Sequence, residues 1–454
     1  MKNTKVLILA AGQGTRMRSK RAKVLHPLCG KKILDYVIGN AQAAGAAEIG
    51  VIVGYQAEQV QASLKPEIKT FRQEEQLGTA HAVMMALPFF EDFSGSLMVL
   101  VGDAPFTRRE TLKAMIAAHE KNDYGVTVLT AEFEDPFGYG RMIKNEAGEL
   151  LAIVEEKDAD ASQKRVKEIN SGMYCFDAQA LALALKEVNT NNAAGEYYLT
   201  DVIEIIRKSG RKAGTYVTND PDDIAAINSK QQLAQAEALM RSRINAVLME
   251  AGVIITDPAT AYIGPDVKIA ANAEILPGTI LEGQTVIGED SVIGPYSRLR
   301  DAVIGERVTV ENSTILESTV GDDSKVGPYA YIRPGSAIGK GCKVGDFVEV
   351  KNSNMGDHSK ASHLTYIGDG DVGQGVNLGC GTVFVNYDGK NKYRTVVEDQ
   401  AFVGCNTNLI APVTVKKGAY IAAGSTITDE VPEDSLAIAR CRQVNKDGYL
   451  KNKK

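Results

Sequence analysis

The first residues with chemical potential follow a glycine-rich turn near the N-terminus. In LILAAGQGTRM, Gly12 and Gly14 let the backbone approach a polyphosphate closely, and Arg16 and Lys23 place positive charge just beyond the turn. Positive charge there suits transfer of a phosphoryl-type group, because negative charge accumulates at that place during the reaction. The turn lacks the third glycine of a dinucleotide-binding loop, and no Gly-Lys-Ser/Thr closes it as in a P-loop. A plain tight turn beside a solvated basic surface is the alternative interpretation.

A carboxylate follows another apolar run of the same half. Asp103, in VLVGDAP, comes at the carboxyl end of an expected strand. A carboxylate there can hold Mg²⁺, which usually takes one or two carboxylates together with phosphates and waters. The alternative is a helix N-cap.

A second polar cluster surrounds one of the chain's five histidines, His363. A histidine can take a proton from a reacting group at neutral pH and so serve as a general base. Basic residues nearby can bind a phosphate, and Glu349 is a carboxylate within plausible reach. The cluster contains Arg333, Glu349, Lys351, Tyr366, Asn377, Asn386, Tyr387 and Lys392. The alternative for His363 is a surface or corner residue.

The elements that must position the first group belong to an α/β domain, residues 1–228. The runs KVLIL, EIGVIVG and SLMVLVGDAP predict strands, and ILDYVIGNAQAAG and GTAHAVMMALPFF predict helices between them. This alternation predicts a mostly parallel, Rossmann-like sheet with helices on both faces. Ligands bind beyond the carboxyl ends of the strands in such sheets.

The second group lies in a region with a different period. Residues 229–250 have helical spacing and predict a linker helix. From residue 251 to 454 aliphatic residues recur every six positions, as in Ile263, Ile269 and Ile275. Hexapeptide repeats predict a parallel β-helix whose short strands each point one aliphatic residue into a narrow core.

One stretch, VFVNYDGKNKYRT (383–395), interrupts this period with polar and basic residues around an Asp-Gly turn. Such a turn is the natural tip of a projecting loop. We expect the loop to deliver Asn386, Tyr387 and Lys392 to an active site, which in an oligomer would be that of a neighbouring subunit. The alternative is a surface loop without a role.

Composition excludes some classes of function. The formal net charge is −6, which argues against nucleic acid or anionic membrane as a partner. No apolar run is long enough for a transmembrane helix. The six cysteines are scattered without CxxC pairs, so we expect neither a zinc site nor a disulfide framework. Unpaired cysteines fit a reducing compartment, so we expect a cytoplasmic location.

LAAGQGTRM with the following KVLHPLCGKKIL resembles the sugar-1-phosphate nucleotidyltransferases. The resemblance implies that Arg16 and Lys23 neutralise UTP, and that Asp103 and Asn228 hold Mg²⁺. It implies a uracil contact for Gln73, Gly78 and Thr79, and a sugar contact for Gly140, Glu155 and Asn170. It places Leu9, Ala10, Ala11 and Gly12 along the nucleotide.

From LAAGQGTRM to IARCRQVNK, the chain resembles the bacterial bifunctional N-acetylglucosamine-1-phosphate uridylyltransferase/glucosamine-1-phosphate acetyltransferases. The resemblance makes His363 the base and implies a left-handed β-helix, a homotrimer and a role in supplying cell-wall (peptidoglycan) precursors. It assigns the sugar phosphate to Arg333, Lys351, Tyr366, Asn377 and Lys392. It assigns acetyl-CoA to Cys380, Asn386, Tyr387, Cys405, Ala423 and Arg440.

The sequence is also compatible with two other hypotheses about function. One is a single-activity nucleotidyltransferase whose β-helix only oligomerises or regulates. The other is a sugar-nucleotide-binding regulator without catalysis. The cluster around His363 argues against the first, and the joint presence of Arg16, Lys23 and Asp103 argues against the second.

Overall fold

The computed structural model describes residues 3–192 and 194–451. The chain divides into two compact units, Met1–Ala238 and Leu239–Lys454. Helix α8 (Lys230–Glu250) contains the point of division, where the sequence predicts a linker helix over 229–250.

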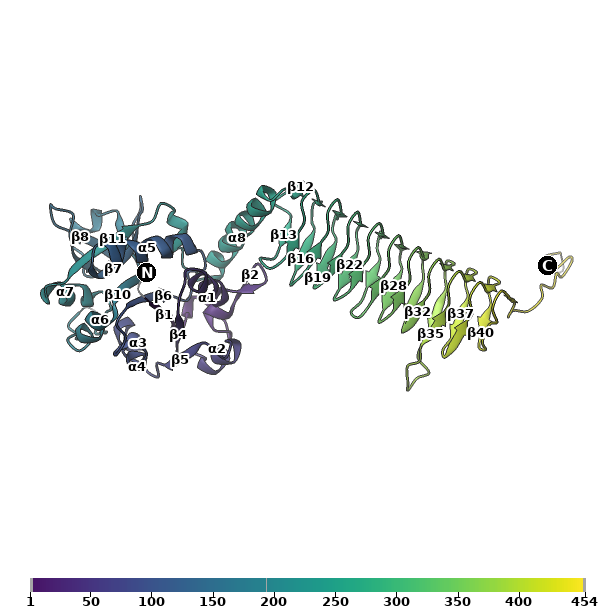
Figure 1. The fold of residues 1–454 in the computed structure, drawn as a ribbon, viewed down its shortest axis with the longest axis horizontal. Helices are drawn as coiled ribbons and strands as arrows, with labels where there is room; N and C mark the ends of the chain where they lie inside the picture. Colours follow the sequence, from purple (N-terminus) through teal and green to yellow (C-terminus); the bar gives the residue numbers. More distant parts are fainter. Residues whose placement is uncertain (1–2, 193, 452–454) are drawn as a thin grey trace. The chain divides into compact units, whose positions relative to one another are not determined.

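The N-terminal unit is built on one twisted sheet (Figure 1). Its strand order is β11-β7-β10-β6-β1-β4-β5, with β8 pairing to β10 and to β9. The strands are β1 (Thr4–Ala10), β4 (Glu48–Val53), β5 (Lys69–Arg72), β6 (Ser96–Val101), β7 (Tyr124–Glu132), β8 (Arg141–Lys144), β9 (Leu150–Val154), β10 (Glu168–Asp177) and β11 (Lys212–Val217). The helices are α1 (Ile33–Ala43), α2 (Ala57–Ser63), α3 (Thr79–Met84), α4 (Leu87–Phe90), α5 (Arg109–Lys121), α6 (Ala178–Ala184) and α7 (Asp201–Lys208).

The central strands of this sheet run in parallel, as the sequence predicts. β1 pairs in parallel with β4 and β6, so that Leu9 lies opposite Ile52 and Val101. β10 is antiparallel to both β6 and β7. The core strands read as continuous apolar runs because both faces of the sheet are covered. The carboxyl ends of β1 and β6 therefore meet at one edge, where Gly12 and Asp103 follow.

The C-terminal unit is a left-handed parallel β-helix of short strands (Figure 1). Successive coils place every third strand in the same flat sheet. Within the described residues these are an eleven-stranded sheet from β12 (Ile254–Ile255) to β41 (Leu436–Ala437), a ten-stranded sheet from β13 (Tyr262–Ile263) to β40 (Thr426–Ile427), and a nine-stranded sheet from β14 (Lys268–Ile269) to β38 (Val413–Val415). The hexapeptide prediction is confirmed.

Each coil buries the aliphatic residues of its repeats in a narrow core. Ile263, Leu281 and Leu299 are register partners on consecutive coils, and all three are buried. Burying such a side chain contributes about 2 kcal/mol. The next partner, Ile315, comes after a shorter coil, which explains the phase slip near residue 304. One residue is lost at each of two corners, between Leu299 and Ile304 and between Val310 and Ile315, so the core column continues without a break.

The last turns of α8 close the first end of the β-helix. Ile244 and Leu248 pack against the core, and Asn245 Nδ2 donates to the carbonyls of Pro258 (2.9 Å) and Ala261 (3.1 Å). No helix among residues 3–192 and 194–451 has the length and apolar character to cross a membrane.

Candidate active sites

A pocket of about 350 Å³ opens at the carboxyl edge of β1 and β6. Its lining includes nine of the predicted residues: Leu9, Ala10, Ala11, Gly12, Lys23, Gln73, Gly78, Thr79 and Asp103. It also includes Gln76 and Glu196. The sequence analysis did not predict these two residues, because neither belongs to a recognisable motif. Strand ends and turns from several separate segments of the chain thus converge on one cavity, as expected for this kind of sheet.

The glycine-rich turn continues into two short 3₁₀ helices, η1 (Thr15–Met17) and η2 (Lys23–Leu25). Gly14 has φ +60°, and a Cβ there would lie 2.9 Å from Lys23 Cβ, so only glycine lets Lys23 pack against the turn. Arg16 lies exposed on η1 and outside the pocket lining. The structure therefore brings Lys23 into the pocket but leaves Arg16 at the surface.

Lys23 joins the two residues predicted to hold a metal. Its Nζ contacts Asp103 Oδ2 and donates to Asn228 Oδ1 at 2.9 Å. The backbone N–H of Ile227 donates to the carbonyl of Asp103 at 2.9 Å, which brings the two segments together. A carboxylate and an amide oxygen that already share a cation fit a hard divalent metal. Among the described residues no group of three or more His, Cys, Asp or Glu side chains could hold a metal ion, so substrate and water would complete such a site.

The residues predicted to contact the uracil form a rigid corner of the pocket. Gln73 is buried, and its Nε2 donates to the carbonyl of Gly78 at 3.1 Å. Gly78 has φ +121°, and a Cβ there would lie 2.4 Å from the carbonyl oxygen of Tyr197. Thr79 Oγ1 accepts from the N–H of Leu199 at 3.0 Å. These contacts hold the Gln73 amide and the backbone at Gly78 in fixed positions.

The three residues predicted to hold the sugar lie together outside the lining of that pocket. The N–H of Asn170 donates to the carbonyl of Gly140 at 2.9 Å, and both Glu155 carboxylate oxygens lie 3.4 Å from where a Gly140 Cβ would be. Burial, and secondarily the charges of Asp158 and Asp201, raise the pKa of Glu155. A carboxyl group that is costly to ionise suits hydrogen bonding to sugar hydroxyls.

In the β-helix, three cations surround one face of the coils that contain the histidine. Arg333 Nη1 bonds Glu349 Oε1 at 2.8 Å, and Lys351 Nζ lies 3.3 Å from Asp369 Oδ2. The Lys392 amine lies beside the Lys351 ammonium. A hydrogen bond that only the neutral Lys392 amine can accept from Lys351, together with the charge of Lys351, lowers the pKa of Lys392. Two adjacent ammonium groups need an anion between them, so this place suits a phosphate.

Asp369 organises this face, and sequence reasoning missed it. It is buried, with φ +50°, and it accepts hydrogen bonds from Asn352 Nδ2 (2.7 Å) and Asn386 Nδ2. Burial opposes its ionisation, but the bonds from Asn352, Asn386 and Lys351 hold its pKa below the usual range. Asn386, which we expected on the acetyl-CoA side, thus lies with the sugar-phosphate group. Tyr366 is the register partner of Glu349 on the next coil, so it lies on the same sheet as Glu349 and Lys351.

His363 has a carboxylate partner, but it is Asp346. His363 ends β30 (Lys360–His363), Asp346 ends β27 (Lys343–Asp346), and the two are register partners one coil apart. Their Nδ1 and Oδ1 atoms are 2.6 Å apart. Glu349 instead pairs with Arg333 and lies opposite Tyr366 in the register. The signal for Asp346 was its separation from His363 by one coil length, which is 17 residues here.

The remaining acetyl-CoA candidates form a column along the last coils. The N–H of Asn406 donates to the carbonyl of Cys380, and the N–H of Gly424 to that of Cys405. A Cβ on Gly404 would lie 2.5 Å from the Ala423 nitrogen, and one on Gly424 would lie 3.6 Å from Arg440 Cδ. Cys380, Cys405, Ala423 and Arg440 therefore follow one another along one edge.

Asn377, on β33 (Asn377–Leu378), extends the sheet of His363 by one coil.

The interrupting stretch is a projecting loop between β34 (Val383–Val385) and β35 (Thr395–Val397), seen beside the β35 label in Figure 1. Tyr387 and Lys392 form an antiparallel bridge across it, and the Asp388 side chain accepts from the N–H groups of Lys390 and Asn391 at its tip. Arg394 is held by Asp371 at the base. The loop returns Lys392 to Lys351 of the same chain.

Two family models and many full-length relatives match the chain. The nucleotidyl transferase family matches residues 5–238, and the GMPPB C-terminal domain matches residues 263–358. The chain is 54% identical over 449 residues to the bifunctional protein GlmU of Alkaliphilus oremlandii (99% of this chain, 98% of the relative). It is 49% identical over 453 residues to the bifunctional protein GlmU of Halalkalibacterium halodurans, with 100% of both chains covered. The chain therefore belongs to the GlmU family of bifunctional proteins, the uridylyltransferase and acetyltransferase enzymes that its motifs resemble.

Proposed function

We propose that the C-terminal unit acetylates glucosamine 1-phosphate from acetyl-CoA, and that the N-terminal unit joins the resulting N-acetylglucosamine 1-phosphate to UMP from UTP. The observation that carries the proposal is that neighbouring coils of the β-helix bear both the His363–Asp346 pair and the cationic group of Arg333, Lys351 and Lys392. A β-helix that only served as a scaffold would need none of these side chains. We assign the activities to residues 1–228 and 251–454, with 229–250 as the linker.

In the acetyl-transfer site, the contact with Asp346 sets the tautomer of His363. An ionised carboxylate only accepts hydrogen bonds, so Nδ1 carries the proton and Nε2 keeps its lone pair. His363 Nε2 takes a proton from the sugar's amine as the amine nitrogen attacks the thioester carbonyl of acetyl-CoA. The C–N bond forms, the C–S bond breaks, and CoA leaves as its thiol once it regains a proton. Arg333, Lys351 and Lys392 hold the sugar phosphate, and Tyr366 and Asn377 complete its pocket.

The column Cys380, Cys405, Ala423 and Arg440 is the proposed place of acetyl-CoA, with Tyr387 at the loop. Cysteine needs no nucleophilic role, because direct transfer forms no acyl-enzyme. We also propose a homotrimer in which neighbouring subunits complete these sites, and a cytoplasmic location. The product would supply the synthesis of cell-wall peptidoglycan.

In the uridylyl-transfer site, a phosphate oxygen of N-acetylglucosamine 1-phosphate attacks the α-phosphorus of UTP, and pyrophosphate leaves. Lys23 and Arg16 neutralise charge on the phosphates. Gln73, Gly78 and Thr79 hold the uracil, and Gly140, Glu155 and Asn170 hold the sugar. A divalent cation, which we propose is Mg²⁺, would be held by Asp103 and Asn228 and would supply further charge neutralisation at the phosphates.

A coupled assay tests the whole proposal. Glucosamine 1-phosphate, acetyl-CoA, UTP and Mg²⁺ should give UDP-N-acetylglucosamine, detected by chromatography and mass. Leaving out acetyl-CoA should abolish that product, and adding N-acetylglucosamine 1-phosphate should restore it. Failure of the complete mixture would contradict the two-site proposal. Restoration by N-acetylglucosamine 1-phosphate without any product from the complete mixture would favour a single-activity nucleotidyltransferase.

A further inference from the structure

Two segments that come from distant strands supply Asp103 and Asn228. Asp103 follows β6, whereas Asn228 ends the segment after β11. Strands β7 and β10 lie between β6 and β11 in the sheet, so the sheet itself does not fix one segment against the other. Contacts outside the strands must therefore set the distance between the side-chain oxygens of Asp103 and Asn228.

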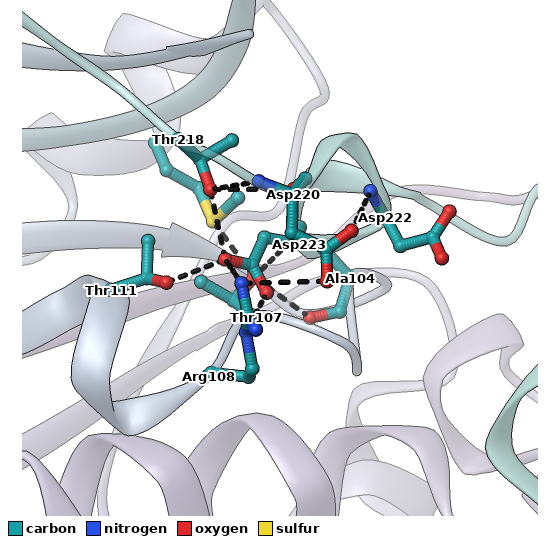
Figure 2. A network of polar contacts seen from close by, with 9 residues as sticks. Ala104, Thr107, Arg108, Thr111, Thr218, Asp220, Asp222 and Asp223 are labelled. Carbon is teal, nitrogen blue, oxygen red and sulfur yellow. Dashed lines mark hydrogen bonds and ion pairs between the residues drawn. The ribbon is translucent and has the colours of Figure 1, made fainter. Parts of the chain in front are cut away.

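A buried network around Asp223 joins the two segments (Figure 2). Asp223 lies in the 3₁₀ helix η4 (Pro221–Ile224) and is 0% exposed. Its carboxylate accepts hydrogen bonds from Arg108 Nε (2.8 Å) and Nη2 (3.0 Å). Arg108 belongs to the segment that follows Asp103. It also accepts from Thr111 Oγ1 (2.5 Å) on α5 and from Thr218 Oγ1 (3.0 Å) at the end of β11.

The backbone around this carboxylate is tied in the same way. Thr107 Oγ1 donates to the Asp223 carbonyl at 2.7 Å, and Arg108 Nη2 lies 3.4 Å from Asp220 Oδ2. The Asp220 side chain accepts from the N–H of Asp222 at 3.1 Å (Figure 2). A buried carboxylate is tolerated only when its oxygens are paired, and a fully paired network fixes the positions of all its members. The turn 220–224 therefore has one position relative to residues 107–111.

We propose that Asp223 is a positioning residue for uridylyl transfer, which locks the segment bearing Asn228 to the segment bearing Asp103. From Asp223 the chain runs four residues to Ile227, whose N–H meets the Asp103 carbonyl, and then to Asn228. Asp223 is not among the residues that line the pocket, and its carboxylate bonds Arg108, Thr111 and Thr218, so it acts through the segments that it joins. The inference rests on the proposed role of Asp103 and Asn228 as ligands of a divalent cation.

A matched pair of substitutions tests this proposal. In this pair, Thr111→Val removes one hydrogen-bond donor to Asp223 at nearly constant shape, whereas Thr111→Ser keeps the hydroxyl. A third substitution, Asp223→Asn, removes the charge of the carboxylate. We expect Thr111→Val and Asp223→Asn to raise the half-saturating Mg²⁺ concentration for uridylyl transfer by at least about threefold, the effect of one buried hydrogen bond. Thr111→Ser should stay near the parent enzyme, and acetyl transfer should be unchanged in all three.

Hydrogen exchange of the ligand-free enzyme supplies a readout apart from activity. The amide of Ile227 should exchange faster in Thr111→Val and Asp223→Asn, while amides of β1 and β6 stay protected. Unchanged exchange at Ile227, or a loss of rate that saturating Mg²⁺ does not reduce, would overturn the proposal. Asp103→Asn separates the two ideas: if it leaves the Mg²⁺ dependence unchanged, the proposed ligand is wrong, and the exchange result still decides whether Asp223 links the segments.

Discussion

The pair formed by His363 and Asp346 gives the sharpest prediction for acetyl transfer. His363→Ala removes the proposed base, and Asp346→Asn keeps the shape of its partner while removing the charge. An amide can donate to Nδ1, which would move the imidazole proton to Nε2 and take away the lone pair that the reaction uses. Both substitutions should therefore lower the rate of the chemical step.

The two losses should differ in size. A positioned general base contributes about 10²–10⁴-fold, so His363→Ala should lose acetyl transfer by that factor. The side chains of His363 and Asp346 are 54% and 37% exposed, so water can partly replace the carboxylate. Solvent screening limits such contacts to about 1 kcal/mol, and we expect about a fivefold loss for Asp346→Asn.

Initial rates of N-acetylglucosamine 1-phosphate formation measure this effect, with uridylyl transfer of the same preparation as the internal control. Glu349→Gln is the matched carboxylate control, because Glu349 lies on the neighbouring strand but bonds Arg333. It should raise the KM for glucosamine 1-phosphate more than it lowers kcat. Retention of more than about a tenth of acetyl transfer by His363→Ala would refute the assignment of the base. So would an equal loss of both activities, since the proposed sites lie in separate units.

Two other predictions concern the metal and the loop. Asp103→Asn should weaken Mg²⁺-dependent uridylyl transfer alone, because it removes the only carboxylate of the proposed ligand pair; an equal fall in acetyl transfer would contradict the division of sites. Lys392→Ala should lower kcat/KM for glucosamine 1-phosphate by about tenfold, the worth of a charged hydrogen bond, while Lys390→Ala at the tip of the same loop should not. Because Lys351 lowers the pKa of Lys392, its proton is lost first as the pH rises, so KM should increase toward alkaline pH and Lys392→Arg should remove that increase. A KM for Lys392→Ala equal to that of the parent enzyme at all pH values would leave the loop without a role.

Much of the fold could be predicted because its periods are simple. A six-residue repeat has one compact solution, and an apolar strand before a glycine-rich turn predicts the edge where Lys23 and Asp103 meet. Coil length was less predictable: the approximate 18-residue coil shortens to 17 at His363, and that single residue decides whether Asp346 or another side chain faces the histidine. Asp369 and Asp223 escaped prediction for a related reason. Their roles depend on partners brought close by tertiary structure, and a buried aspartate in a turn looks like any turn residue in the sequence.

The seal that α8 forms on the first coil has a consequence for dissecting this protein. A parallel stack of strands ends in unpaired N–H and C=O groups, and such an edge can template the addition of another molecule, as in fibril growth. Ile244, Asn245 and Leu248 occupy that edge. A fragment that starts at residue 251 would therefore expose the unpaired edge of the first coil, and such fragments would associate end to end. A fragment that starts at or before Leu239 keeps the part of α8 that covers this edge.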